Sequence, residues 1–393
     1  NSREMKFAVV LIEVLVASFA VSTVSAGDRL VFAQALWRHG DRTPSPTYQN
    51  DPYQEAFWSL PWGELTTWGM KQSFRQGQRL KRRYIDEFAL VSKDYKRQEI
   101  SVRSSDTHRC IQSAFANLAG FYSSSNGTHP SDVVDWPAAW TPVPVHTMPG
   151  NEDPELKPAE NCPKAKELAA ERLLHKEFLE FVASKWELFA EIAKNTGNTT
   201  KMEFEGLSVF YGVVKIERDY YNLTLPAWIT DKLFNDLEDA IEKGMDYVFG
   251  APGFGRPADN HFIKLFGGFL LTEWLGNFER AAGGHGGEKY KAYSAHDATV
   301  TALLMTLGAK TAILGGKNPD FASTVVGELW QREEDKQFYV QFLFAPDSYS
   351  ELAAFTRHIP GCPADSDLCP LSTFAARSKP FLAKDHGIEC GFI

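Results

Sequence analysis

Apolar and polar positions divide the first part of the chain into short segments. Residues 30–37 form an almost continuous apolar run, which predicts a buried strand, and residues 66–84 carry apolar side chains among basic ones, which predicts a helix. A second short strand is predicted over residues 100–102, followed by a helix that is capped by Asp106 and runs to Phe121. This part of the chain is therefore expected to alternate strand and helix.

The middle of the chain has a helical pattern with no clear strand. It extends over residues 154–249, where apolar side chains recur at helical spacing. Beyond it, residues 289–293 predict a strand and residues 298–307 a helix. Residues 325–330 and 338–344 predict an antiparallel pair of strands around a charged turn.

Strands that alternate with helices at both ends of a chain are typical of an α/β fold. We expect a mixed central sheet flanked by helices, formed by residues 27–150 and 250–393. Residues 151–249 are expected to form a smaller, mainly helical cap, inserted between the two parts of this core.

Residues 1–26 have the pattern of a secretory signal peptide preceded by a few leader residues. Lys6 supplies a short positive region, residues 7–20 form an apolar run, and residues 24–26 fit a small-residue cleavage site. The run is short for a membrane anchor, and no later segment has the about 18 consecutive apolar residues that a transmembrane helix needs. We therefore expect a soluble, secreted protein. Three glycosylation acceptors agree with export: Asn126, Asn198 and Asn222.

Charge and composition indicate which kinds of ligand the protein can bind. The chain has 41 Lys and Arg against 50 Asp and Glu, a net charge of −9. This balance argues against a general basic surface for nucleic acid, although a few arginines can still bind a small anion. The histidines and cysteines lack the spacing of a zinc site, and we expect neither a metal nor another cofactor.

The five cysteines are an odd number, which leaves at least one thiol unpaired. Cys362 and Cys369 flank a short polar loop, where a local disulfide would fit. Cys110 lies in a predicted amphipathic helix, which favours a buried thiol. Cys162 and Cys390 then remain as a long-range pair, but the sequence alone leaves the connectivity open.

Polar clusters follow three of the predicted strands. They are Arg38-His39-Gly40-Asp41-Arg42-Thr43-Pro44, Arg103-Ser104-Ser105-Asp106 and His296-Asp297. Ligands bind at strand ends in α/β sheets. A guanidinium offers two parallel donors to phosphate oxygens, a neutral imidazole can attack phosphorus, and a neighbouring carboxylic acid can protonate the leaving group. The clusters therefore predict a metal-free site for phosphoryl transfer.

The first and third clusters resemble those of the histidine acid phosphatase family, a branch of the histidine phosphatase superfamily. Similarity to the prostatic and lysosomal acid phosphatase subgroup extends over essentially the whole mature chain and includes residues 65–77, 102–109, 140–146 and 222–228. The resemblance implies a secreted acid phosphatase that hydrolyses phosphate monoesters, either small molecules or phosphoproteins, through a phosphohistidine intermediate.

The resemblance also implies a role for each matched residue. His39 is the expected nucleophile and Asp297 the expected general acid. The phosphate is expected to be bound by Arg38, Arg42, Arg103 and His296. Trp140 and His146 match a segment that takes part in dimer contacts in the family, so a homodimer is implied.

The family pattern implies disulfides between Cys162 and Cys390 and between Cys362 and Cys369, with Cys110 free; a third family pair is missing from this chain.

Two alternative functions stay open. One is a phytase-like inositol phosphate phosphatase, which turnover of phytate would reveal. The other is a secreted binding or antigenic protein on a phosphatase scaffold, which would show no turnover.

Overall fold

The computed structural model describes residue 25 and residues 27–125, 128–130, 132–137, 140–157, 162–197, 203–285 and 287–392. The predicted signal peptide, apart from Ser25, and the predicted glycosylation sites Asn126 and Asn198 lie outside the described residues.

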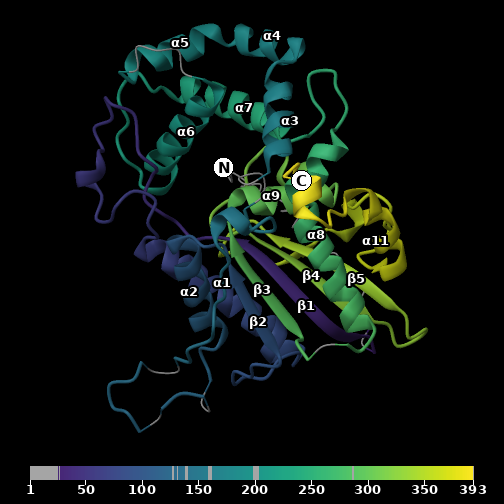
Figure 1. The fold of residues 1–393 in the computed structure, drawn as a ribbon. Helices are drawn as coiled ribbons and strands as arrows, with labels where there is room; N and C mark the ends of the chain where they lie inside the picture. The colour runs from purple at the N-terminus through teal and green to yellow at the C-terminus, as the bar shows by residue number, and fades with distance from the viewer. Residues whose placement is uncertain are drawn as a thin grey trace, which may run out of the picture.

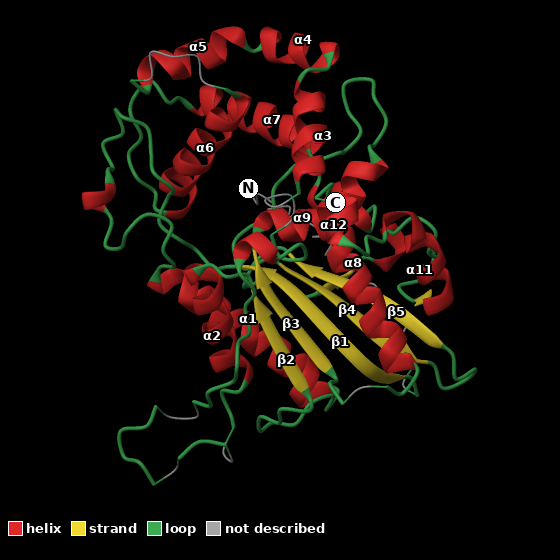
Figure 2. Ribbon diagram, in the orientation of Figure 1, coloured by secondary structure: helices red, strands yellow, loops and turns green. Residues whose placement is uncertain are grey.

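Within the described residues, seven strands form one mixed sheet, in the order β2-β3-β1-β4-β5-β6, with β7 also paired to β5 (Figure 2). The strands are β1(Arg29–Arg38), β2(Ile100–Ser104), β3(Tyr290–Ala295), β4(Thr324–Gln331), β5(Phe338–Ala345), β6(Ala353–Ala354) and β7(Cys369–Pro370). β1, β2 and β3 are parallel, whereas β4 and β5 run antiparallel to their neighbours. The expected mixed α/β sheet is thus confirmed.

The three parallel strands end at the same level of the sheet. Arg38 at the end of β1 pairs with Ala295 of β3, and Ser104 at the end of β2 pairs with Ser294. Because of this register, the residues that follow β1 and β3, His39 and His296, leave the sheet side by side.

The apolar run in β1 reflects burial on both faces of the sheet. Phe32 and Leu36 pack into one hydrophobic core, and Trp37 packs into the core on the opposite face. The single polar residue of the run, Gln34, is fully buried, but its amide donates to the Trp274 carbonyl and accepts from Asn277. A central parallel strand is expected to be continuously apolar for this reason.

Helices cover both faces of the sheet (Figure 1). Side chains of α1(Thr67–Lys81) and α2(His108–Phe121) contribute to one core, and those of α8(Asn260–Ala282), α9(Asp297–Thr306) and α11(Leu371–Ser378) to the other. α1 and α2 approach closely, because a Cβ on Gly77 would lie 1.9 Å from the Asn117 carbonyl oxygen. The helix α2 begins later than expected, with Thr107 rather than Asp106 at its N-cap position.

The helical middle of the chain divides into α3(Pro163–Leu173), α4(Lys176–Ser184), α5(Trp186–Asn195), α6(Phe204–Lys215), the π-helix η4(Ile216–Tyr220) and α7(Asp231–Val248). In Figure 1, α4 to α7 lie beyond the end of the sheet at which β1 and β3 finish. Side chains of α5, α6 and α7 share a hydrophobic cluster, which also includes Tyr48 from the core sequence. That residues 151–249 form a separate domain stays a prediction.

The remaining helical segments are short. They are η1(Glu55–Phe57), the π-helix η2(Arg82–Glu87), η3(Gly150–Glu152), α10(Lys310–Leu314), η5(Thr356–His358), η6(Lys379–Phe381) and α12(His386–Glu389).

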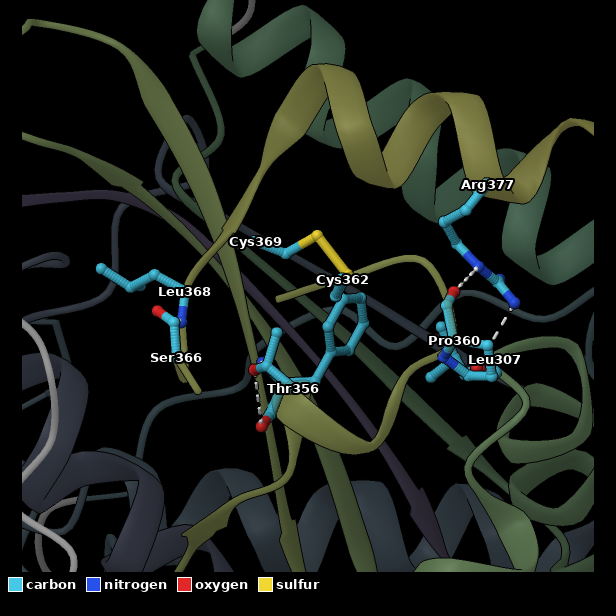
Figure 3. The surroundings of a disulfide bond; sticks show 9 residues. Leu307, Thr356, Pro360, Cys362, Ser366, Leu368, Cys369 and Arg377 are labelled. Atoms are coloured by element: carbon cyan, nitrogen blue, oxygen red, sulfur yellow. Dashed lines mark hydrogen bonds between the residues drawn. A yellow bond between two sulfur atoms is a disulfide. The ribbon is translucent and has the colours of Figure 1, made fainter. Parts of the chain in front are cut away.

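Two disulfides hold the C-terminal part of the chain. Cys162, which precedes α3, is joined to Cys390 after α12, across 228 residues. Cys362 and Cys369 close a loop of 7 residues before α11, beside Arg377, which donates to the Pro360 carbonyl (Figure 3). These are the two pairs that the family resemblance implied. The thiol of Cys110 is free and buried.

Removal of the long-range disulfide should destabilise the protein more than removal of the local one. In the chain-entropy view, closing 228 residues rather than 7 restricts the unfolded chain more, by about 3 kcal/mol. The double variant C162S/C390S should therefore unfold at a lower urea concentration than C362S/C369S. Equal losses in the two variants would contradict this account.

Candidate active site

The loop after β1 brings His39 to the end of the sheet. The backbone N–H of His39 donates to the Ala295 carbonyl at 3.0 Å and so continues the β1–β3 pairing for one more residue. Gly40 follows and lies directly against the first turn of α1, where a Cβ would be 2.2 Å from the Gly69 carbonyl oxygen. Only glycine permits this approach, which keeps the loop next to the sheet.

Hydrogen bonds define the tautomer of His39. Its Nδ1 lies 2.8 Å from the carbonyl oxygen of Gly40, which can only accept, so Nδ1 carries the proton. Nε2 is then the atom with the free lone pair, and it accepts from Nε of Arg109 at 3.0 Å. The side chain is 2% exposed. Burial, followed by the charges of Arg109 and Arg38, holds the pKa of His39 well below its usual value.

Arg38 and Arg42 supply positive charge around this imidazole. The guanidinium of Arg38 donates to the Pro319 carbonyl at 2.7 Å, stands over the ring of Phe321 and forms an ion pair with Asp297 at 3.1 Å. Burial, and then the charges of Arg109 and Arg38, lower the pKa of Arg42 to about 10. The Nε–H groups of Arg38 and Arg42 are buried without an acceptor in the described part of the chain. Such donors suit the oxygens of an anion.

Arg103 does not join this group, which corrects the role expected for it. Its guanidinium donates to Asp153 at 2.6 Å and to Glu155 at 2.9 Å, and it lies 3.6 Å from Glu273. The cause is its place inside β2, opposite Tyr293, on the face of the sheet that α8 covers. Its charge is already balanced by these carboxylates.

Arg109, rather than Arg103, is the third arginine beside His39. It lies in the first turn of α2, beyond the end of β2, and its side chain reaches Nε2 of His39. The sequence pattern could have indicated Arg109 rather than Arg103. Alternation along residues 100–104 puts Arg103 on the face opposite Val102, whereas an arginine at the start of the next helix can reach the end of the sheet.

His296 and Asp297 lie where β3 gives way to α9. The His296 ring is 5.7 Å from that of His39, centroid to centroid, and its Nε2 is 3.0 Å from the Ser105 hydroxyl. Burial, and then Arg109, lower the pKa of His296 to about 3, so this ring is neutral. Burial raises the pKa of the Asp297 carboxyl, but the charge of Arg38 holds it below its usual value.

A cavity of about 530 Å³ extends from Arg38, Arg42 and Asp297 toward the cap. Its walls come from α6, η4 and the segment after α10, and they include the aromatic rings of Tyr220 and Phe321. These two rings contact each other with centroids 4.9 Å apart. The cavity places apolar and aromatic surface next to the charged end of the sheet.

The other predicted positions lie outside this cluster. Trp140 is half-buried and packs against Trp136, and His146 is exposed, with its backbone bridged to β2 at Arg103. Asn222, the one predicted glycosylation site among the described residues, is exposed. Among the described residues, no helix is both long and apolar enough to cross a membrane, and no three His, Cys, Asp or Glu side chains gather as they would around a metal.

Comparison with known proteins places the chain among phosphatases. The family model for the histidine phosphatase superfamily (branch 2) matches residues 29–345. Prostatic acid phosphatase of Bos taurus is 31% identical over 364 residues, which cover 92% of this chain and 87% of the relative. Lysosomal acid phosphatase of Rattus norvegicus is 33% identical over 362 residues, covering 92% and 80%.

Solved structures share the fold at lower identity. The Hafnia alvei phytase in complex with tartrate aligns with a TM-score of 0.66 and 17% identity, over 93% of this chain and 99% of that one. The multiple inositol polyphosphate phosphatase of Bifidobacterium longum, in complex with inositol hexasulfate, aligns with a TM-score of 0.62 and 14% identity, over 93% and 95%. At these identities the likeness concerns the fold alone.

Arg109 and Arg103 should respond differently to substitution. R109Q removes a cation from the cluster around His39, so the Kd for inorganic phosphate should rise about tenfold or more. R103Q should bind phosphate nearly normally, but it leaves the buried Asp153 carboxylate without its ion pair and should lower the Tm. Calorimetric titration and thermal unfolding of both variants would measure this. Weak phosphate binding by R103Q alone would restore the original assignment.

Proposed function

Because the chain belongs to the histidine phosphatase superfamily (branch 2) and is a phosphoric monoester hydrolase of the acid phosphatase type, we propose that His39 is its nucleophile and Asp297 its general acid. The observation that carries the proposal is the state of His39. Its Nε2 is unprotonated, and it lies among the guanidiniums of Arg38, Arg42 and Arg109. A neutral imidazole in a cationic surrounding is suited to attack on a phosphate dianion.

The first half-reaction forms a phosphohistidine. Substrate phosphate oxygens offer Arg109 stronger acceptors than the His39 ring, so the guanidinium moves to them and frees the Nε2 lone pair. Nε2 then bonds to phosphorus as the bond from phosphorus to the ester oxygen breaks. Asp297 gives its proton to that oxygen, and the alcohol leaves. The Nδ1–H···O=C bond to Gly40 stabilises the positive ring that results.

The second half-reaction returns the enzyme to its starting state. Asp297, now a carboxylate, takes a proton from a water molecule that attacks phosphorus. The bond between phosphorus and Nε2 breaks, inorganic phosphate leaves, and Asp297 is again protonated. His296, neutral and hydrogen-bonded to Ser105, can donate to a phosphate oxygen throughout.

Substrate binding is what makes Asp297 an acid. Without substrate, the ion pair with Arg38 favours its carboxylate. A bound phosphate dianion neutralises Arg38 and brings negative charge close to Asp297, and both changes raise the carboxyl pKa. Protonation of Asp297 is therefore coupled to substrate binding, which agrees with activity under acidic conditions.

The cavity favours small monoesters over inositol polyphosphates. Apart from Arg38 and Arg42, the charged residues that line it are two lysines and three carboxylates: Lys215, Lys317, Glu242, Asp297 and Asp320. Lys215 is already paired with Asp219 and Glu238. A substrate with six phosphates would need many more unpaired cations. This lining supports the acid phosphatase reading over the phytase-like one.

Export and assembly complete the proposal. Two disulfides fit an extracellular protein, and the proposed signal peptide would deliver it there. The protein would act as a homodimer, with Trp140 and His146 at the contact, and it would need no cofactor.

Replacement of His39 should abolish turnover without unfolding the protein. H39A removes the ring that forms the covalent bond, so hydrolysis of p-nitrophenyl phosphate should fall by at least about a thousandfold. The Kd of H39A for phosphate should stay within a few-fold of the wild-type value, and its Tm should stay within a few degrees. Acid quenching during turnover should trap an acid-labile phosphoenzyme in the wild type but not in H39A. Near-normal turnover in H39A would overturn the mechanism.

Replacement of Asp297 should have an effect that depends on the leaving group. D297N cannot donate the proton, so hydrolysis of alkyl phosphates should slow by about 10²–10⁴-fold. p-Nitrophenolate leaves readily without protonation, and release of the nitrophenol should slow much less. The ratio of kcat/KM for the two substrates, wild type against D297N, measures the difference. An equal loss on both substrates would exclude Asp297 as the general acid.

A further inference from the structure

Glu217 is a buried carboxyl that the reaction does not use. It lies in the π-helix η4, which continues α6 toward the active site, and it is 0% exposed. Neither of its oxygens has a hydrogen-bond donor in the described residues. The group within hydrogen-bonding reach is a second carboxyl, that of Asp51.

The carboxyl of Asp51 accepts two hydrogen bonds from its own segment of the chain. Its Oδ1 accepts from the backbone N–H of Tyr53 at 2.8 Å, and its Oδ2 accepts from the Thr47 hydroxyl. The phenol of Tyr48 also lies near the pair, with Tyr53 beside it; Tyr48 is buried, and its pKa is raised by burial and then by Asp51 and Glu217. A neutral phenol brings no positive charge to the two carboxyls.

Two buried carboxylates in contact would repel each other strongly, and no cation of the described residues is among the groups that act on Glu217. A proton held between them removes the repulsion and supplies the missing donor. Burial, together with the hydrogen bond and charge of Asp51, raises the pKa of Glu217 to about 9. At neutral and acidic pH Glu217 is therefore a carboxylic acid, whose proton it can donate to the carboxyl of Asp51.

The position of Glu217 connects this pair to the active site. Tyr220, at the end of η4, lines the cavity and contacts Phe321. Tyr221, the next residue, donates to Oδ2 of Asp41 at 2.9 Å. Asp41 follows the His39–Gly40 loop directly and precedes Arg42. The anchoring of η4 thus decides where two tyrosines meet the cavity and the loop that carries the nucleophile.

We propose that Glu217 is a positioning residue: its protonated side chain donates to the Asp51 carboxylate and so fastens η4 to the segment at residues 47–53, which holds Tyr220 and Tyr221 against the active site. The effect on substrate binding rests on the proposed function. The protonation and the fastening do not, and they can be tested without turnover.

The sign of the pH effect follows from the direction of the shift. The pKa of Glu217 is raised from 4.5 to about 9 on folding, so the folded state holds a proton that the unfolded state releases. The stability that the pair contributes is fully present below pH 4.5. It declines as the pH rises toward the folded pKa, because unfolding then releases a proton.

E217Q keeps a donor toward Asp51 but cannot ionise, so it separates protonation from packing. Its Tm should match that of the wild type at pH 4.5 and exceed it at pH 7.5 by about 5 °C. D219N is the matched control, because Asp219 lies two residues away in an exposed pairing with Arg218 and Lys215. Its difference from the wild type should not grow with pH in this way. A shift in E217Q that is equal at both pH values would overturn the proposal.

Infrared difference spectra test the proton directly. The difference spectrum, wild type minus E217Q at pH 7, should show the carbonyl band of a protonated carboxylic acid. Absence of this band would contradict the protonation of Glu217.

The positioning role needs a kinetic readout with an aryl phosphate near pH 5. E217A should raise KM several-fold with a smaller change in kcat, and E217Q should restore KM. If E217A and E217Q raise KM equally, the donated hydrogen bond does not position the site.

Discussion

The active site depends on one electrostatic constraint: three guanidiniums and two imidazoles share a buried space at the end of the sheet. Burial, and then the arginine charges, oppose protonation of the rings, so His39 and His296 are neutral and Nε2 of His39 keeps its lone pair. Burial, and then the charges of Arg109 and Arg38, also lower the pKa of Arg42. A phosphate dianion relieves this repulsion, so binding energy comes from a strain that the folded protein already holds.

The register of the sheet makes that crowding possible. Because Arg38 is level with Ala295, the residues after β1 and β3 must leave the sheet together. This part could be predicted from the sequence, since a buried parallel strand has a recognisable apolar run and its chemistry follows directly in the chain. His39, Arg42 and Asp297 all lie within five residues of a predicted strand, which is why they were found.

The sequence alone could not show whether Arg103 or Arg109 lies at the active site. Both lie near the end of β2, and the choice between them depends on which face of the sheet Arg103 meets and on what covers that face. Asp153, Glu155 and Glu273 come from distant parts of the chain, and no local pattern links them to Arg103. The same holds for Glu217 and Asp51, whose pairing exists only because the cap folds back onto residues 47–53.

These cases share a physical logic. Where a buried charge has opposite partners, as Arg103 does, it holds the fold together and is unavailable for a ligand. Where like charges meet without partners, either a ligand or a proton must compensate. A bound anion would compensate the arginines around His39, and a shared proton compensates the carboxyls of Glu217 and Asp51. An acidic medium supplies protons to Glu217 and to Asp297 alike, so acidity favours both the hydrogen bond that fastens η4 and the protonated form of the general acid.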